Sequence, residues 1–165
     1  MKKKLLFILC LFLFNLNSFS QATSMFCTNP AAEQLMLGNY NPAMYTASTI
    51  INFPDSISKG ILQRVNSDTL KQYILQLASF KNRNTGSDTL SSIHGFGAAR
   101  QWVYSKFQEY STANENRLLP SYFQFSQAIC SMDIHKNIIA ILPGIDTTDK
   151  SIVLIEGHID RKSVV

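Results

Sequence analysis

Two apolar runs late in the sequence constrain the fold more than any other feature. Residues 137–142 and 151–156 are rich in Ile, Val and Leu, and the polar connection between them contains Pro143 and Gly144. Nearly continuous apolar runs of this length are typical of strands buried on both faces beneath helices. Because the connection is too short for a helical crossover, the two strands are expected to be antiparallel. The runs therefore predict an α/β fold.

Two amphipathic helices and a further strand are expected before these runs. Ser67 is a good N-cap for the first helix, and the second begins near 93–97 and ends near Tyr110, after a polar loop at 81–92. A short aromatic strand is expected at 122–125. Apolar residues at helical spacing form the two stripes expected to face the core: Leu70, Tyr73, Ile74, Leu77 and Phe80 in the first helix, and Phe96, Ala99, Val103, Phe107 and Tyr110 in the second.

Residues 1–20 have the three parts of a secretory signal peptide. Three lysines precede the apolar run 5–14, which is too short to span a bilayer as a helix. Ser18-Phe19-Ser20 places cleavage before Gln21. We expect a protein that is secreted or periplasmic, with no stable membrane span after cleavage. An uncleaved membrane anchor is the alternative.

The composition indicates a globular protein without a nucleic-acid partner. The chain is 45% hydrophobic and 16% charged, so it has enough apolar residues for a sizeable core. Three of the four net positive charges come from the signal peptide, and the remainder is close to neutral. No Gly-rich phosphate loop, nucleophile elbow or Cys-x-x-Cys motif is present.

Residues 21–60 are rich in Asn, Pro, Ser and Thr and are expected to form an extended N-terminal leader. The peptidase-like domain discussed below would then begin at residue 61. Removal of the signal peptide leaves Cys27 and Cys130, which are able to pair in an oxidising compartment. Their spacing does not decide whether they do.

The second apolar run leads into the strongest candidate site. Gly157, which would permit a tight turn, precedes His158-Ile159-Asp160 at a strand end, where α/β enzymes place ligand-binding groups. The neutral imidazole of His158 is able to bind zinc, and Asp160 is able to accept the proton of the other ring nitrogen and so orient the ring. A loop-capping role for His158 is the alternative. His94 and His135 have no carboxylate or cysteine at ligand spacing and are expected to be structural.

The order of four segments resembles the co-catalytic zinc aminopeptidases of metallopeptidase family 28, over roughly residues 68–160. The segments are Arg83-Asn84-Thr85-Gly86-Ser87, Gly97-Ala98-Ala99-Arg100-Gln101-Trp102, Lys136-Asn137-Ile138-Ile139-Ala140-Ile141-Leu142-Pro143-Gly144 and Ile155-Glu156-Gly157-His158-Ile159-Asp160. The resemblance implies a three-layer sandwich with a mixed, mostly parallel central sheet flanked by helices. It also implies two zinc ions at the strand ends and a peptide or protein substrate with a free amino terminus.

Within this resemblance His158 matches the first zinc ligand, and Asp160 matches the catalytic-site carboxylate that orients it. The other metal ligands and the general base lie further along the chain in that family. We therefore expect residues 61–160 to be an incomplete N-terminal portion of a peptidase domain, inactive and prone to aggregate alone. Residues 161–165 are expected to be a non-native tail, because Asp160 and these residues read as the translation of a common sequencing adapter.

Two further interpretations remain open. One is another zinc enzyme of the same fold, similar to glutaminyl cyclases or to carboxypeptidases that also use His-x-Asp. The other is a secreted, non-enzymatic binding module.

Overall fold

The computed structural model describes residues 24–129, 132–146, 148–149 and 151–160. The predicted signal peptide, Cys130 and the predicted tail at 161–165 therefore lie outside the described residues. The elements in chain order are β1 (Met25–Cys27), α2 (Pro30–Met36), the 3-10 helix η1 (Pro42–Tyr45), α3 (Pro54–Arg64), α4 (Ser67–Ser79), α5 (Gly95–Ala113), β2 (Leu119–Ile129) and β3 (Met132–Ile141). This mixture of helices and strands confirms the predicted α/β class.

The three strands form one antiparallel sheet with the order β1-β2-β3. Leu119 of β2 pairs with Ile141 of β3, and the register shifts between Ser126 and Ile129. Only two residues separate β2 from β3 in the sequence, and so short a connection permits only antiparallel pairing. The described part of the sheet is thus antiparallel rather than mostly parallel, and the three-layer sandwich stays a prediction.

The strand prediction was right for two segments and wrong for the third. The predicted strands at 122–125 and 137–142 fall largely within β2 and β3, which are much longer. Residues 151–156 form no strand, and Ile155 is 91% exposed. The predicted antiparallel pairing of 137–142 with 151–156 is therefore wrong for this structure, because β3 pairs with β2 instead. An apolar run indicates a preference for extended backbone but does not choose its partner.

Both predicted helices are present, with different ends. The N-cap of α4 is Asn66 rather than Ser67, since the Asn66 side-chain oxygen accepts hydrogen bonds from the N–H groups of Asp68 and Thr69 at 2.9 and 3.0 Å. The helix α5 begins at Gly95, as expected, and continues three residues beyond Tyr110. Capping by the preceding residue leaves Ser67 free to begin the helix itself.

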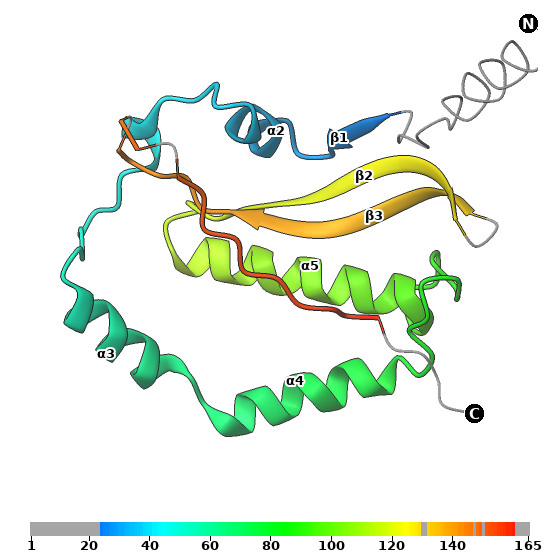
Figure 1. Cartoon of the computed structure of the whole chain (residues 1–165). Helices are drawn as coiled ribbons and strands as arrows, with labels where there is room; N and C mark the ends of the chain where they lie inside the picture. Colours follow the sequence, from blue (N-terminus) through cyan, green and yellow to red (C-terminus); the bar gives the residue numbers. More distant parts are fainter. Residues whose placement is uncertain (1–23, 130–131, 147, 150, 161–165) are drawn as a thin grey trace, which may run out of the picture.

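The sheet, α5 and α4 lie in successive layers (Figure 1). The rings of Tyr104 and Tyr122 stack at 4.6 Å and join α5 to β2. Trp102 meets Tyr73 edge-on at 5.4 Å and joins α5 to α4. Aromatic pairs of this kind add about 0.5–1.5 kcal/mol beyond the area that they bury.

The buried core within the described residues is small. Phe80, Ala98 and Ala99 form its centre between α4 and α5, with Leu77 and Trp102 packed against them. The predicted stripe of α4 is only partly buried, because Leu70 and Ile74 are exposed at 51% and 67%. Large apolar side chains of α3, α4 and residues 152–155 also face solvent. The sizeable core that the composition allows is not formed by the residues described.

The segment predicted as an extended leader contains regular structure. The strand β1 joins the sheet, and three helices begin at prolines, namely Pro30, Pro42 and Pro54. Asn29 and Asn41 cap the first two of these helices with their side chains. Asn followed by Pro is a helix-start signal, since Pro suits the first helical position. The helix α3 also runs across the predicted boundary at residue 60.

Cys27, the last residue of β1, is buried. Its Sγ lies 3.3 Å from Sδ of Met36 in α2, and burial raises the pKa of the thiol. Pairing with Cys130 stays a prediction, because Cys130 is outside the described residues. Among the helices that the structure describes, none combines the length and apolar character needed to cross a membrane.

Candidate functional site

The two residues of the predicted metal motif are adjacent in the structure. Nδ1 of His158 lies 3.3 Å from Oδ1 of Asp160, and the two side chains are 96% and 39% exposed. Both belong to the irregular segment 151–160, drawn in orange-red to red in Figure 1. In an extended chain, residues two apart project on the same side, which brings this pair together without help from other elements. The metal and catalytic roles of His158 and Asp160 stay predictions.

Gly157 does not form the tight turn expected of it. Its φ angle is outside the left-handed region, and no heavy atom beyond its chain neighbours lies within 4 Å of the position that a Cβ would occupy. The backbone before His158 is therefore open, and a larger residue would fit here.

One side chain from a distant loop attaches the motif to the rest of the fold. Nε of Arg83 donates a hydrogen bond to the carbonyl oxygen of Ile159 at 3.0 Å, and the Arg83 Nη1 donates to the carbonyl oxygen of Leu77 in α4. Ile159 is half-buried, whereas residues 151–158 are exposed. The peptide between His158 and Asp160 is thus held to the C-terminal end of α4.

The loop that carries Arg83 is closed by its own polar groups. The side-chain oxygen of Asn84 accepts from the N–H of Gly86 at 2.8 Å. Oγ of Ser87 donates to the carbonyl oxygen of Asn84 at 2.6 Å and accepts from the N–H of Phe96 at 3.2 Å. These bonds join the loop to the first turn of α5.

Two glycines allow the loop to lie against α5. The N–H of Gly95 donates to the carbonyl oxygen of Phe80 at 2.8 Å, and that of Gly97 donates to the carbonyl oxygen of Asp88 at 2.9 Å. A Cβ on Gly97 would lie 2.6 Å from the carbonyl oxygen of Thr89, closer than such atoms approach. Gly95 also has a φ of +75°, which disfavours other residues. In the sequence these two glycines made the start of the helix hard to place. In the structure they lie where the backbone of the loop comes close to the first turn of α5.

His94 has a carboxylate partner that its sequence neighbours did not reveal. Its Nε2 lies 3.3 Å from Oδ2 of Asp88, and its Nδ1 lies 3.1 Å from Oγ of Ser91. The expectation that His94 lacks such a partner is therefore wrong. Hydrogen bonds from the backbone N–H groups of Ser91 and Leu90 are the main reason that the pKa of Asp88 is lowered.

The Asp88, His94 and Ser91 side chains have the residue types of a hydrolase triad but serve the helix start. Oγ of Ser91 accepts from the backbone N–H groups of Ile93 and His94, both at 3.2 Å. A serine occupied in this way closes a turn before α5. The structural interpretation of His94 therefore stands.

His135 is a structural residue, as expected. It is 7% exposed, its ring stacks on Phe125 at 5.2 Å, and its Nε2 lies 2.9 Å from the carbonyl oxygen of Gln127. These contacts hold β3 against β2 near the register shift.

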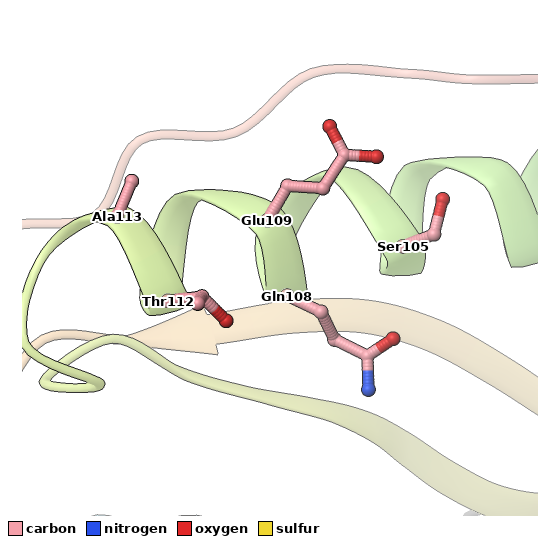
Figure 2. Close-up of a pocket in the computed structure, with 5 residues that line it drawn as sticks. All are labelled: Ser105, Gln108, Glu109, Thr112 and Ala113. Atoms are coloured by element: carbon pink, nitrogen blue, oxygen red, sulfur yellow. The ribbon is translucent and has the colours of Figure 1, made fainter.

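Two further observations concern alternative sites among the described residues. Among the described residues, no three His, Cys, Asp or Glu side chains lie close enough together to hold a metal ion. Figure 2 shows a hollow whose five lining residues all belong to α5: Ser105, Gln108, Glu109, Thr112 and Ala113. Glu109 is paired with Lys106 at 2.7 Å, so the hollow contains no unpaired carboxylate for chemistry. The His158 motif remains the strongest candidate.

The chain is similar to several fungal proteins that carry the name "probable zinc metalloprotease". It is 31% identical over 117 residues to one from Pyrenophora teres f. teres, covering 67% of this chain and 25% of that protein. It is 30% identical over 117 residues to one from Pyrenophora tritici-repentis, covering 67% of this chain and 26% of that protein. A third, from Leptosphaeria maculans, is 26% identical over 113 residues, covering 66% of this chain and 26% of that protein.

The chain thus spans about a quarter of the length of the curated relatives that it matches. No family model matches the chain. No solved structure matches it significantly.

Proposed function

We propose that this chain belongs to an exported, zinc-dependent aminopeptidase, in which His158 binds zinc and Asp160 orients its ring. The observation that carries the proposal is the contact of Nδ1 of His158 with Asp160, which leaves the other nitrogen of an exposed ring open to solvent. Similarity to proteins named probable zinc metalloproteases supports a zinc-dependent peptidase in general. The resemblance to family 28 supports the narrower assignment to peptides with a free amino terminus.

The described residues include a suitable type of zinc ligand, but not enough ligands for a catalytic zinc site. Imidazole nitrogen is a preferred zinc ligand, and a carboxylate on the other ring nitrogen is its usual partner. A catalytic zinc normally has three protein ligands and one open position. His158 supplies one ligand, and the resemblance to family 28 implies that the remaining ligands of the two proposed zinc ions lie further along the chain. When bound, zinc would polarise the substrate carbonyl and activate water.

A metal and activity assay on the protein that contains this chain tests the proposal. We expect His158→Ala to lower the bound zinc and to abolish release of amino acids from aminoacyl-nitroanilides. His94→Gln is the matched control, because His94 lies at the start of α5 and is not part of the proposed zinc site. The zinc content of the His94→Gln variant should equal that of the unaltered protein. Zinc content and hydrolysis unchanged by His158→Ala would show the proposal to be wrong.

Assays with modified peptides distinguish an aminopeptidase from the other zinc enzymes expected to share its fold. An aminopeptidase should lose activity when the amino terminus of the peptide is acetylated, whereas a carboxypeptidase-like enzyme should not. A glutaminyl cyclase-like enzyme should instead convert an amino-terminal glutamine to pyroglutamate. Failure of the zinc-loaded protein in all three assays would favour a non-enzymatic binding module.

Export has its own test. The mass of the protein isolated from the culture medium or periplasm should correspond to a chain that begins at Gln21. A protein that retains residues 1–20 in the membrane fraction would contradict cleavage.

A further inference from the structure

We propose that Arg83 is a positioning residue that holds the His158 and Asp160 side chains in a set place relative to α4 and α5. The inference rests on the proposed zinc-binding role of His158 and adds a residue from a distant loop to that site. Arg83 and Ile159 are 76 positions apart, and the contact between them is a side-chain to backbone hydrogen bond of 3.0 Å.

The guanidinium of Arg83 connects two carbonyl groups that have no partner in a regular element. Leu77 is in the last turn of α4, where helix carbonyls lack an intrahelical donor. Nη1 of Arg83 satisfies this group, and its positive charge is favourable at the negative end of the helix. Nε of the same planar group reaches Ile159. A rigid fork of donors allows Arg to hold both oxygens in one geometry, which Lys does not.

The hydrogen bond from Arg83 restricts the motif because it is made to the residue between His158 and Asp160. Residues 151–158 are exposed, and an exposed segment without regular hydrogen bonds has little resistance to local opening. Ile159 lies between the two side chains of the motif, so its carbonyl group belongs to the peptide that joins it to Asp160. Holding this peptide restricts the backbone that carries both His158 and Asp160.

The loop around Arg83 does not depend on its side chain for closure. Asn84, Ser87 and the N–H groups of Gly86 and Phe96 make the bonds that close the loop and join it to α5. Loss of the guanidinium should therefore release the segment 157–160 while the loop and α5 remain folded. This separates positioning from a general structural role.

NMR on the protein that contains this chain, with zinc chloride as the probe, tests the proposal. Arg83→Met keeps an unbranched apolar stem but removes the donors. Backbone order parameters at 157–160 should fall below those of the unaltered protein. Zinc binding, followed by the ring nitrogen shifts of His158, should weaken about tenfold or more, as is usual when support of a metal ligand is lost. Arg64→Met is the matched control, because the side chain of Arg64 donates to the carbonyl oxygen of Gly60 within its own helix.

The outcomes distinguish this inference from the proposed function. A folded Arg83→Met chain with unchanged order and zinc affinity would overturn the role of Arg83 even if His158 binds zinc. If zinc does not shift the His158 ring in the unaltered chain, the proposed metal role is wrong, and the order parameters alone decide whether Arg83 holds the segment. If Arg83→Met does not fold, Arg83→Lys is tested instead. A zinc affinity of Arg83→Lys equal to that of the unaltered protein would show that the two donors of the guanidinium group are not needed.

Discussion

Asp160 directs a carboxylate oxygen at Nδ1 of His158 from 3.3 Å, although the histidine ring is almost fully surrounded by solvent. Such a carboxylate selects the ring orientation, and in the proposed zinc site it would leave Nε2 to bind the metal. We expect Asp160→Asn to lower the zinc affinity of His158 by about 10–100-fold. Isothermal titration of the protein that contains this chain with zinc chloride measures the change.

Asp149→Asn is the control for this substitution. The Asp149 carboxylate accepts from the N–H of Ser151 at 2.8 Å, just before the same segment. Loss of the Asp149 carboxylate should leave the zinc affinity unchanged. Equal affinities for Asp160→Asn and the unaltered chain would contradict the orienting role.

A methyl group at Gly97 should destabilise the fold. Its Cβ would lie 2.6 Å from the carbonyl oxygen of Thr89 and 2.9 Å from that of Ser91, and both are backbone atoms. Because the loop must move to accept it, Gly97→Ala should lower the free energy of unfolding by about 1–3 kcal/mol. Urea denaturation followed by circular dichroism measures this quantity.

Gly157→Ala is a matched control for Gly97→Ala. The surroundings of Gly157 are open within 4 Å, and its φ angle is accessible to other residues. This variant should unfold at the same urea concentration as the unaltered chain. A loss at Gly157 equal to that at Gly97 would show that the close approach at α5 is not the cause.

Ser121 is fully buried and joins the sheet to the start of α2. Its Oγ accepts from the N–H of Asn29 at 3.0 Å and donates to the carbonyl oxygen of Tyr122 at 3.1 Å. Ser121→Ala leaves the Asn29 N–H without this acceptor, which should cost about 1–3 kcal/mol of unfolding free energy. Thermal unfolding by calorimetry measures the loss.

Ser126→Ala controls for the removal of a hydroxyl group from the same strand. Ser126 bonds to Ser24 at an exposed position, where water replaces the lost partner. The melting temperature of this variant should stay close to that of the unaltered chain. A larger loss for Ser126→Ala than for Ser121→Ala would contradict the prediction.

Tyr110 should make the contact between α4 and α5 sensitive to alkaline pH. Its hydroxyl lies 2.7 Å from that of Tyr73, and this hydrogen bond is the main reason that the pKa of Tyr110 is raised to about 12. The unfolded chain has the ordinary pKa of about 10. The shift therefore contributes stability below pH 10, and this contribution is lost as the pH rises to about 12.

Tyrosinate absorbance and urea midpoints across this pH range test the coupling. In Tyr73→Phe the pKa of Tyr110 should fall towards its ordinary value, and the urea midpoint should depend less on pH above 10. Tyr45→Phe is the control, because Tyr45 lies in η1 and contacts Tyr40 instead. A Tyr110 pKa unaffected by Tyr73→Phe would refute the assigned cause.

Local patterns predicted the parts of the fold that depend on near neighbours. The helices α4 and α5 follow from apolar spacing, and the contact of His158 with Asp160 follows from the two-residue repeat of extended chain. Asn29 and Asn41 before prolines were also local signals, but the polar composition around them hid the helices that they cap.

Contacts between distant residues were not predictable in this way. Nothing near Arg83 in the sequence points to Ile159, and nothing near Cys27 points to β2 as the partner of its strand. The run at 151–156 shows the same limit. Its composition suits a strand, but none of the described strands pairs with it. Chain-distant partners depend on the packing of whole elements, which periodicity does not describe.

The pairing of β1 with β2 has a consequence for the order of synthesis. Ser24 and Ser126, which bond beside this pair, are 102 residues apart. At about 5–20 residues per second, a ribosome needs on the order of 5–20 s to produce the second strand after the first. For that interval the amino-terminal strand of each nascent chain has no sheet to join, and whatever binds it first competes with its native partner.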